Sequence, residues 1–574
     1  MQQLKKYGIL FILIVTIATY LTSLEHGFTH LDDYEQVVEN PNIRAVNASS
    51  IKAIFSSTSV GMYQPLTTFF YALTYTFLGK EAYNFHVLSL LFHLLNIVLV
   101  YLLLKKLKLN ESYALLFASI FALHPMQVES VSWVSAFSNL TYSCFYLLAL
   151  IYYRNFTLGY SKAYYITLLL FLLSLFSKST AVTLPMVLLA MDYFQNKKII
   201  LKDFINKLPF FALSFVFGLI TIYSRESVGH LSDLSVQFNW FERVFLISYS
   251  FLFYPLKWIA PFELSAFYPY PEVEVYLPIV YYFSLPMLLI LLFIVWKKRE
   301  NSLLVFGTLF YLLTIAIVVQ LIPVGNQLTT DRYVYLPMLG FFLILYSFLK
   351  GKKIKLPSIL SAGIAVIFLI LSFQRTKVWA NDGLIWEDVI HKYPKVAQAY
   401  NNLGSYQLEN GNTKEAFELF NSAVELKPYY ADALSNRGNL YSQMGNSQEA
   451  LADYTHAIAH RPHADAYFNR ANEYNKLNQF DKAIADYEAS AQLKESTDTY
   501  TNWAYTLLQL KQINKADEKL NLALGINPNF APALFLKGMI FQQKEEYDLA
   551  CNYFRKAEKQ NYSQAKLALI RFCN

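Results

Sequence analysis

The sequence predicts an all-α protein in two parts: a polytopic transmembrane helical body, followed by an α-solenoid of helical repeats. Three observations lead to this prediction. Hydrophobic residues make up 55% of the 574 residues and charged residues only 16%, a balance that favours a membrane protein. Apolar stretches long enough to cross a bilayer, or nearly so, recur over the first 375 residues. From about residue 396 this pattern gives way to a repeat of 33 or 34 residues.

The apolar body begins with the run 7–24, which follows Lys5 and Lys6 and has no small-residue cleavage pattern after it. We therefore expect a first transmembrane helix that stays attached, and not a removed signal peptide. The further candidate spans are 85–104, 112–124, 131–153, 163–177, 180–194, 208–224, 240–260, 278–296, 302–323, 333–349 and 357–373.

Short basic loops between these spans indicate which side of the membrane each loop occupies, because positive loops stay cytoplasmic. The basic residues concerned are Lys105, Lys106, Lys108, Arg154, Lys162, Lys197, Lys198, Lys202, Lys207, Lys297, Lys298, Arg299, Lys350, Lys352, Lys353 and Lys355. Counted from a cytoplasmic N-terminus, they share one side only if 240–260, interrupted by Pro255, dips into the membrane without crossing. The prediction is then about 11 crossings, with everything after about residue 374 outside the cytoplasm. We also expect 240–260 to line a lipid-fed groove.

The C-terminal repeats place small residues at two fixed positions, which lets paired helices approach closely. The first position holds Gly404, Gly438, Ala471, Ala504 and Gly538, and the second holds Ala416, Ala450, Ala483, Ala516 and Ala550. Prolines at repeat ends complete the tetratricopeptide-repeat pattern. The expected domains are a body at 1–375, a linker at 376–395, five repeats at 396–562 and a capping helix at 563–574.

One face of the predicted solenoid carries a row of asparagines at a single repeat position: Asn401, Asn436, Asn469 and Asn502. Stacked helix pairs form a concave binding surface, so this row could hold a polypeptide partner or acceptor. The alternative is a solvated helix face whose asparagines bond from turn to turn. No chemistry is expected there.

The net charge of +7 does not predict nucleic-acid binding, because the basic residues of the body sit in orientation-setting loops and no recognised binding motif accompanies them. The three cysteines, Cys144, Cys551 and Cys573, are odd in number and scattered. We expect neither a disulfide framework nor a metal site from them.

A candidate catalytic group follows the first helix, where Asp32 and Asp33 stand side by side in the first outer loop. Neighbouring side chains of an extended segment diverge, so only one of the two can point into a shared site while the other anchors the loop. A carboxylate there could act as a general base toward an acceptor hydroxyl. The alternative is an ordinary acidic loop.

Other charged groups fall on the same predicted outer side. His124 and Glu129 could shape a pocket with His86, while Lys178 and Arg332 could stabilise a phosphate leaving group. Their ordinary alternatives are a side chain that reaches the membrane surface for Lys178, and pairing with Asp331 or lipid head groups for Arg332. His86 and His93 lie on one helix face, but without a carboxylate at ligand spacing they predict packing and not a metal site.

An ordered set of motifs resembles one known family. The matching stretches are Leu31-Asp32-Asp33 with Asn40-Pro41, Pro65-Leu66-Thr67, Phe85-His86 through His93, Phe121 to Pro125 with Glu129 to Ser135, Ser177-Lys178, Phe267 to Pro271, and Asp331 to Pro337. Together with the fused repeats, they make the chain similar to the transmembrane and tetratricopeptide-repeat-containing O-mannosyltransferases of the GT-C glycosyltransferase superfamily. A bacterial-type member is indicated.

The resemblance implies an inverting transferase that passes a sugar such as mannose from a polyprenyl-phosphate donor to an acceptor hydroxyl outside the cytoplasm. It makes Asp32, in preference to Asp33, the base, assigns the donor phosphate to Arg332 and Lys178, and assigns the acceptor or sugar pocket to His124, Glu129 and His86. No cofactor is predicted, and dependence on a divalent metal stays open. Departures from the family pattern at Met126, Gln127, Ser179 and Asp331 leave the sugar and the acceptor open.

Two other functions fit the same architecture. One is a non-enzymatic, membrane-anchored scaffold whose repeats recruit envelope or secretory proteins, and the other is a lipid-linked polymer ligase or polymerase. The compact body and short loops favour a bacterial inner membrane, with the N-terminus cytoplasmic and the repeats outside. The paired aspartates together with Lys178 and Arg332 favour transfer chemistry, because a scaffold needs none of them.

Overall fold

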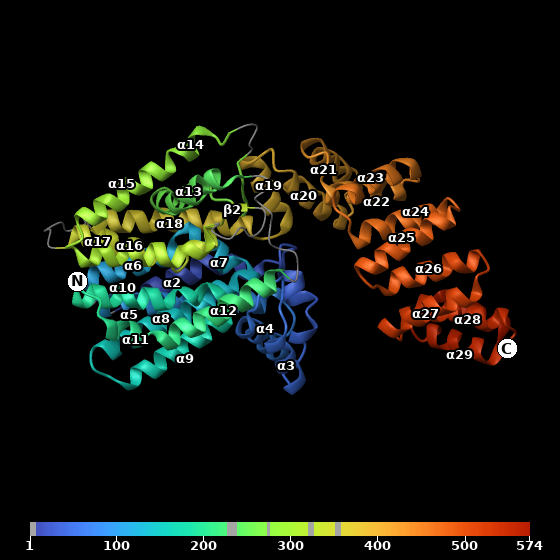
Figure 1. Ribbon diagram of the computed structural model, residues 1–574, viewed down its shortest axis with the longest axis horizontal. Coiled ribbons are helices and arrows are strands. Elements are labelled where there is room, and N and C mark those ends of the chain that lie inside the picture. The colour runs from blue at the N-terminus through green and yellow to red at the C-terminus, as the bar shows by residue number, and fades with distance from the viewer. Residues whose placement is uncertain (1–6, 227–237, 272–275, 320–326, 351–357, 574) are drawn as a thin grey trace. The chain divides into compact units, whose positions relative to one another are not determined.

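The computed structural model describes residues 7–226, 238–271, 276–319, 327–350 and 358–573 (Figure 1). These residues form two compact units, Met1–Pro394 and Lys395–Asn574. Helices dominate both units, as the sequence predicts. The strands found among the described residues are β1 (Tyr268–Pro269) and β2 (Gln327–Thr329), which pair antiparallel with Tyr268 opposite Thr329.

The first unit is a bundle of α-helices joined by short turns of 3-10 or π-helix. Its α-helices are α2 (Gly8–Tyr20), α3 (Ala48–Ser56), α4 (Pro65–Leu78), α5 (Ala82–Lys106), α6 (Glu111–Leu123), α7 (Val128–Ser132), α8 (Phe137–Thr157), α9 (Lys162–Ser177), α10 (Leu184–Asn196), α11 (Leu201–Ile205), α12 (Leu208–Glu226), α13 (Trp240–Ile259), α14 (Ile279–Tyr282), α15 (Ser284–Lys297), α16 (Ser302–Ile315), α17 (Met338–Leu349), α18 (Ser358–Val378) and α19 (Asp382–Lys392). The short turns are η1 (Leu21–Glu25), η2 (Tyr34–Val38), η3 (Pro41–Ile43), η4 (Pro125–Gln127), η5 (Val134–Ala136), η6 (Ser179–Thr183), η7 (Ala316–Val318) and η8 (Asp331–Val334).

Within the described ranges, five helical segments are long and apolar enough to cross a membrane, or up to seven if each of two bent pairs counts as one span. The five are Gly8–Glu25, Ala82–Lys106, Val134–Thr157, Leu208–Arg225 and Ile279–Lys297. The bent pairs are Glu111–Leu123 with Pro125–Ser132 and Gly363–Val378 with Asp382–Lys392. The apolar helices Lys162–Ser177, Ser302–Val318 and Met338–Leu349 are shorter, so the total of 11 crossings stays a prediction.

The expected interruption at Pro255 is absent: α13 runs unbroken through it to Ile259, and this segment is not among those long and apolar enough to cross. Proline has no N–H to give to the carbonyl four residues earlier, which is that of Phe251. The Tyr311 hydroxyl donates to this carbonyl instead, at 2.6 Å. A side chain from α16 thus satisfies the group that would otherwise break the helix.

The core of the body lies around α8, which packs against α5 and α9 (Figure 1). In the candidate span that contains α8, Val134–Thr157, 89% is buried. In the candidate span Ile279–Lys297 only 6% is buried, so its apolar side chains face outward.

The helices α16 and α17 touch through their backbones. A Cβ built at Gly307 would lie 2.9 Å from the carbonyl oxygen of Gly340, so only small residues permit this contact.

Three of the predicted cytoplasmic loops gather at one end of the body. Lys106, at the end of α5, donates to the side chain of Asn155 at 2.6 Å, and Arg154 donates to Gln195. Lys207 forms a buried ion pair with Asp192. These three basic loops therefore lie at the same end of the bundle.

Residues 376–395, expected as a linker, instead contain the end of α18 and the helix α19, which belong to the first unit. Polar contacts hold α19 on the body. Asp382 accepts hydrogen bonds from the backbone N–H of His30 at 3.0 Å, and Asp388 pairs with Arg375 at 2.7 Å. His30 is 352 positions from Asp382, whereas Arg375 is only 13 positions from Asp388, so only the first of these contacts joins distant parts of the chain.

The second unit is a stack of five helix pairs followed by a capping helix (Figure 1). The pairs are α20 (Ala397–Glu409) with α21 (Thr413–Leu426), α22 (Ala431–Gln443) with α23 (Ser447–His460), α24 (Ala464–Lys476) with α25 (Phe480–Leu493), α26 (Thr497–Gln509) with α27 (Ile513–Ile526), and α28 (Ala531–Gln543) with α29 (Tyr547–Glu558). The cap is α30 (Ser563–Phe572).

The small residues of the repeats act as the pattern predicts. A Cβ at Gly438 would lie 2.8 Å from the ring of Tyr454, so the aromatic side chain of the second helix occupies the space that glycine leaves. Gly404 faces Phe420 and Gly538 faces Phe554 in the same way. The repeat architecture is confirmed.

The expectation that the cysteines form no disulfide is wrong, because Cys551 and Cys573 are bonded, with their Cα atoms 5.7 Å apart. They lie on α29 and just after α30, two helices that pack against each other and so bring positions 22 apart into contact. Cys144 is free and buried in the body.

Candidate active site

A cavity of about 320 Å³ in the body is lined by three of the seven site residues predicted there. It brings together Asp32 from the first loop, Lys178 from the end of α9 and Arg332 from η8. These positions span 300 residues of sequence, and only the packing of the helix ends brings them together. The rest of its lining includes Gln64, Trp133, Asn139, Thr221, Ile222, Arg225, Ile317, Val318 and Tyr333.

The two aspartates have different surroundings, although they lie in a turn that enters η2 and not in the extended segment that was expected. Asp33 is buried and accepts hydrogen bonds from the backbone N–H groups of Thr29 and Ser135, at 2.9 and 2.8 Å, and from both hydroxyls. It fastens the first loop to η5. Asp32 is only half-buried and lines the cavity. The geometry therefore makes Asp32 the candidate base and Asp33 the anchor.

Lys178 lies where α9 ends, in an extended conformation that turns its side chain toward α8. Its Nζ donates to Oδ1 of Asn139 at 2.6 Å and stands 5.9 Å from the centre of the Tyr333 ring. Since this side chain contacts protein and lines the cavity, its position differs from that of a lysine reaching toward lipid head groups.

Arg332 is fixed by Glu129 through two contacts. The backbone N–H of Arg332 donates to Oε2 at 2.9 Å, and the guanidinium pairs with Oε1. The guanidinium also lies over the ring of Trp133, 4.9 Å from its centre. Glu129 therefore positions Arg332 and, contrary to expectation, does not itself line the cavity.

Sequence reasoning missed three contributors to this cavity. Arg225, the last residue of its apolar span, adds a third cation, and a lone charge at a span end was the available signal. Trp133 and Asn139 are buried, and their Nε1 and Nδ2 atoms have no hydrogen-bond partner among the described residues. Two buried donors beside three cations suit a ligand rich in negatively charged oxygen.

Burial and neighbouring charges shift the pKa values of the ionisable groups in the cavity. Burial raises the pKa of the Asp32 carboxyl to about 6, although the positive charge of Arg332 opposes the shift. Burial, helped by Arg332 and Arg225, lowers the pKa of the Lys178 ammonium to about 7. Burial also acts to lower the pKa of Arg332, but the Glu129 carboxylate outweighs it and holds that pKa above its usual range. At neutral pH the site thus holds an ionised carboxylate and a permanent cation.

The two histidines expected near the site lie elsewhere. His124 is buried in the bend between α6 and α7, where its Nε2 lies 3.0 Å from the carbonyl oxygen of Trp258 and its Nδ1 accepts from the backbone N–H of Met126 at 3.3 Å. His86 is buried against the ring of His26. Neither lines the cavity, because their helices turn them into the interior. Across the described ranges, no group of three or more potential metal ligands is gathered.

The asparagine row of the repeats joins neighbouring helix pairs. The side-chain nitrogens of Asn436, Asn469 and Asn502 donate to asparagine oxygens of the preceding repeat, at 2.9–3.0 Å. A pocket of about 600 Å³ is lined by Asp432, Ser435, Asn436, Asn439, His463, Asp465, Phe468 and Asn469. The row therefore makes repeat-to-repeat hydrogen bonds and also borders a pocket.

Comparison with known proteins finds tetratricopeptide repeats in the C-terminal part of the chain. The tetratricopeptide repeat family matches residues 385–431, 431–463, 464–496 and 531–564. Among solved structures, that of YrrB, a TPR protein with an unusual peptide-binding site, is 20% identical and covers 32% of this chain and 97% of its own, with a TM-score of 0.29. Pseudomonas aeruginosa pilF is 21% identical and covers 31% of this chain and 83% of its own, with a TM-score of 0.30.

Relatives found by sequence comparison share a common name. A protein O-mannosyl-transferase of Caenorhabditis elegans is 23% identical over 446 residues, which is 74% of this chain and 63% of that protein. The protein O-mannosyl-transferase TMTC1 of Mus musculus is 30% identical over 24% of this chain and 15% of its own length. The chain thus spans less than two thirds of the length of these relatives. The chain is thus similar to protein O-mannosyl-transferases and carries C-terminal tetratricopeptide repeats.

Proposed function

We propose that this chain is a membrane glycosyltransferase that moves a sugar, with mannose the first candidate, from a polyprenyl-phosphate donor to a hydroxyl of a polypeptide on the extracytoplasmic side. The observation that carries the proposal is the cavity in which Asp32 faces Lys178, Arg225 and Arg332. One carboxylate opposite three cations suits proton removal on one side and an anionic leaving group on the other.

In the proposed reaction, the Asp32 carboxylate accepts the proton of the acceptor hydroxyl. The freed oxygen attacks the anomeric carbon of the sugar, while the bond from that carbon to the phosphate oxygen breaks. The electron pair of the broken bond stays on the phosphate, which leaves as polyprenyl phosphate. Attack from the face opposite the leaving group inverts the anomeric carbon, and no covalent enzyme intermediate is needed.

The cations act on the leaving phosphate. Arg332 is held by Glu129 in a fixed orientation, so its guanidinium needs little reorganisation as charge develops. Lys178 is oriented by Asn139 in the same way. The two buried donors of Trp133 and Asn139 offer hydrogen bonds to further oxygens of the phosphate or sugar.

An apolar part of the cavity wall suits the prenyl chain. It is formed by Ile222 of α12 and by Ile317 and Val318 of η7, and the two isoleucines are exposed on the body surface. No residue of 240–260 lines the cavity, so in this proposal the prenyl chain enters beside Ile222 of α12 and Ile317 of η7 instead. An isoprenoid that enters here would keep its tail in lipid while its phosphate meets the cations.

Two observations support the extracytoplasmic placement of the site and of the repeats. Lys162 and Lys178 lie at opposite ends of α9, so the site is at the end of this helix away from its basic loop. The disulfide between Cys551 and Cys573 belongs to an oxidising compartment, because cytosolic thiols are kept reduced.

We further propose that the repeats hold a polypeptide, the acceptor or a partner, on the asparagine-lined face. The pocket there combines Asn436, Asn439 and Asn469 with the ring of Phe468. Side-chain amides can pair with both N–H and C=O groups of a peptide backbone, and the ring offers an apolar contact.

The test compares sugar transfer from a polyprenyl-phosphate mannose by the purified full chain and its variants. Asp32→Asn should reduce kcat by at least about 100-fold, the usual contribution of a general base. Arg332→Ala should also lose turnover, while Glu25→Gln, an exposed carboxylate near the same loop, should leave it unchanged. Asp33→Asn should lower the amount of folded protein, because it removes the anchor of the loop.

Full turnover by Asp32→Asn and Arg332→Ala, at normal membrane levels, would contradict the proposal and favour the scaffold function. Transfer of a lipid-linked polymer in place of a single sugar would favour the ligase or polymerase function.

A further inference from the structure

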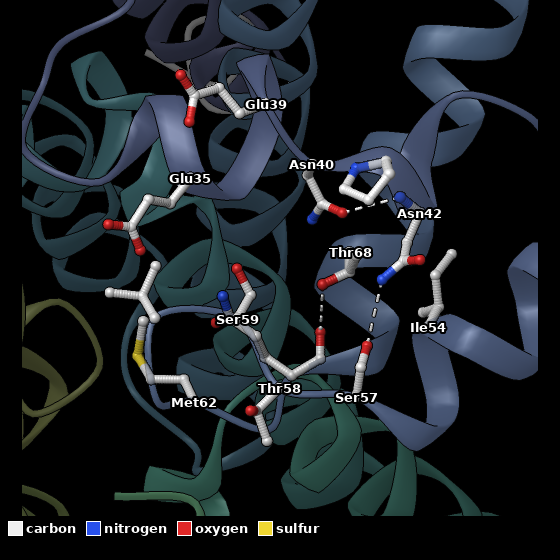
Figure 2. Close-up of a pocket in the computed structure, with 13 residues that line it drawn as sticks. Glu35, Glu39, Asn40, Asn42, Ile54, Ser57, Thr58, Ser59, Met62 and Thr68 are labelled. Atoms are coloured by element: carbon white, nitrogen blue, oxygen red, sulfur yellow. Dashed lines mark hydrogen bonds between the residues drawn. The ribbon is translucent and has the colours of Figure 1, made fainter. Parts of the chain in front are cut away.

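A second pocket, of about 330 Å³, adjoins the candidate active site in the same unit (Figure 2). It is built from the first loop and the start of α4. Glu35 and Met62 lie on one side of it, and Asn42 and Ser57 lie on the other, where the Asn42 amide donates to the Ser57 hydroxyl at 3.4 Å (Figure 2). The function proposed above leaves this pocket unused.

The two pockets share part of their walls: Val60, Met62 and Gln64 line both. Val60 and Met62 belong to a tight turn closed by two backbone hydrogen bonds between Ser59 and Met62, at 2.9 and 3.0 Å. A molecule lying in the second pocket would therefore be separated from the cavity of Asp32 by these side chains only.

The shared wall contains a buried polar group that lacks a partner. Gln64 is 3% exposed, and its Nε2 donates to Oε1 of Gln36 at 3.0 Å. Its own Oε1 accepts no hydrogen bond from any residue that the structure describes. A buried amide oxygen on a cavity wall costs free energy unless something donates to it, so it indicates a ligand that carries N–H or O–H groups.

The charged groups of the second pocket are acidic. Glu35 and Glu39 follow Asp32 along the chain, both are exposed, and both line the pocket. No lysine or arginine is among the described residues that line it. An anionic donor phosphate is disfavoured in such surroundings, whereas a basic side chain is attracted to them.

We propose that this pocket is the subsite for the acceptor polypeptide, and that it selects a hydroxyl residue with lysine or arginine beside it. The hydroxyl reaches Asp32 past the wall of Met62 and Gln64. The flanking basic side chain lies near Glu35 and Glu39, and a backbone N–H of the peptide donates to Oε1 of Gln64. This inference rests on the proposed function for the hydroxyl, but the binding of the basic peptide does not require turnover.

The first experiment measures binding by the full chain without any donor. The probes are two fluorescent peptides with a central threonine, one flanked by lysines and the other by glutamines, and the readout is fluorescence anisotropy. The lysine peptide should bind about fivefold more tightly than the glutamine peptide, the effect of two exposed charge pairs. The double variant Glu35→Gln, Glu39→Gln should abolish this difference.

Matched variants separate the pocket from other surfaces. Glu81→Gln removes an exposed carboxylate that lines neither pocket, and it should leave both affinities unchanged. Met62→Trp fills the shared wall and should weaken both peptides. Peptide held only by the repeats would be insensitive to all three changes, so unchanged affinities across this set overturn the proposal, as does equal binding of the two peptides by the native chain.

A second measurement distinguishes failure of this inference from failure of the proposed function. Sugar transfer from polyprenyl-phosphate mannose to both peptides should show a lower KM for the lysine peptide. If the chain bound the lysine peptide selectively but transferred no sugar, the subsite proposal would stand and the proposed transferase activity would be contradicted. If sugar were transferred with the same KM for both peptides, the proposed transferase activity would stand and the subsite proposal would be contradicted.

Discussion

Glu129 and Arg332 lie 203 positions apart in sequence, yet one carboxylate receives both the backbone N–H and the guanidinium of the same arginine. Both side chains are largely buried, at 1% and 15% exposure. Because the carboxylate also accepts the backbone N–H, it fixes the turn η8 as well as the side chain. The arginine that faces the proposed donor phosphate is therefore oriented by a residue outside the cavity.

Loss of this carboxylate should be costly to stability. Glu129→Ala leaves a buried guanidinium without its partner, and the free energy of unfolding should fall by about 3 kcal/mol. Glu129→Gln keeps an acceptor for the backbone N–H and should cost less. Thermal unfolding in detergent measures both. Glu111→Ala removes the more exposed pair with Lys105 and serves as the control, with an expected loss below about 1 kcal/mol.

The proposed activity should have a bell-shaped pH dependence. The pKa of Asp32 is raised to about 6, so its carboxylate forms, and kcat/KM rises, as pH increases through 6. The pKa of Lys178 is lowered to about 7, so its positive charge, and the binding of an anionic donor, are lost as pH increases through 7. Lys178→Arg should extend activity to higher pH. A flat profile between pH 5 and 8 would contradict these roles.

The helix through Pro255 should depend on Tyr311. Tyr311→Phe removes the donor to the carbonyl of Phe251 and should lower the free energy of unfolding by about 1 kcal/mol. In a Pro255→Ala background the alanine N–H can take this carbonyl, so the same substitution should cost less. A double-mutant cycle measures the difference, and additive effects would show that the two groups do not compensate each other.

Val60 should store backbone strain at the shared wall of the two pockets. Its φ of +51° is unfavourable for a β-branched residue, so Val60→Gly should raise the free energy of unfolding by about 1 kcal/mol. The same change removes part of the wall and should weaken binding of the lysine peptide. Gly79→Ala makes the opposite change at φ +98° and should destabilise the fold. If Val60→Gly stabilised the fold but did not change the affinity for the lysine peptide, the conformation of Val60 would have no role in peptide binding.

The disulfide of the repeat unit should hold the capping helix in place. Cys551→Ser with Cys573→Ser opens a loop of 22 residues and should lower the stability of the C-terminal repeats by about 3 kcal/mol. Limited proteolysis of the full chain measures this loss. In intact cells these two thiols should react with a maleimide only after reduction. Reaction without reductant would place the repeats in a reducing compartment.

Much of the fold and part of the site could be predicted because their signals are local. The repeat of small residues required paired helices, and Gly438 against Tyr454 shows why no larger side chain fits. The different surroundings of Asp32 and Asp33 were expected from an extended loop, but they arise in a turn that enters η2, so the expected reason was wrong. The helical character of 376–395 was missed, and the contact that fastens Asp382 to His30, 352 positions away, could not be predicted from the neighbouring sequence.

The sequence by itself determined the two-part architecture, the register of the repeats and the candidates Asp32, Lys178 and Arg332, since hydrophobicity and period act along the chain. Only the tertiary structure decided that Glu129 positions Arg332, that Arg225 and Asn139 join the cavity, and that His124 and His86 do not. These outcomes depend on which helix ends meet across hundreds of residues, and a side chain's direction is set by that packing and not by its neighbours in sequence.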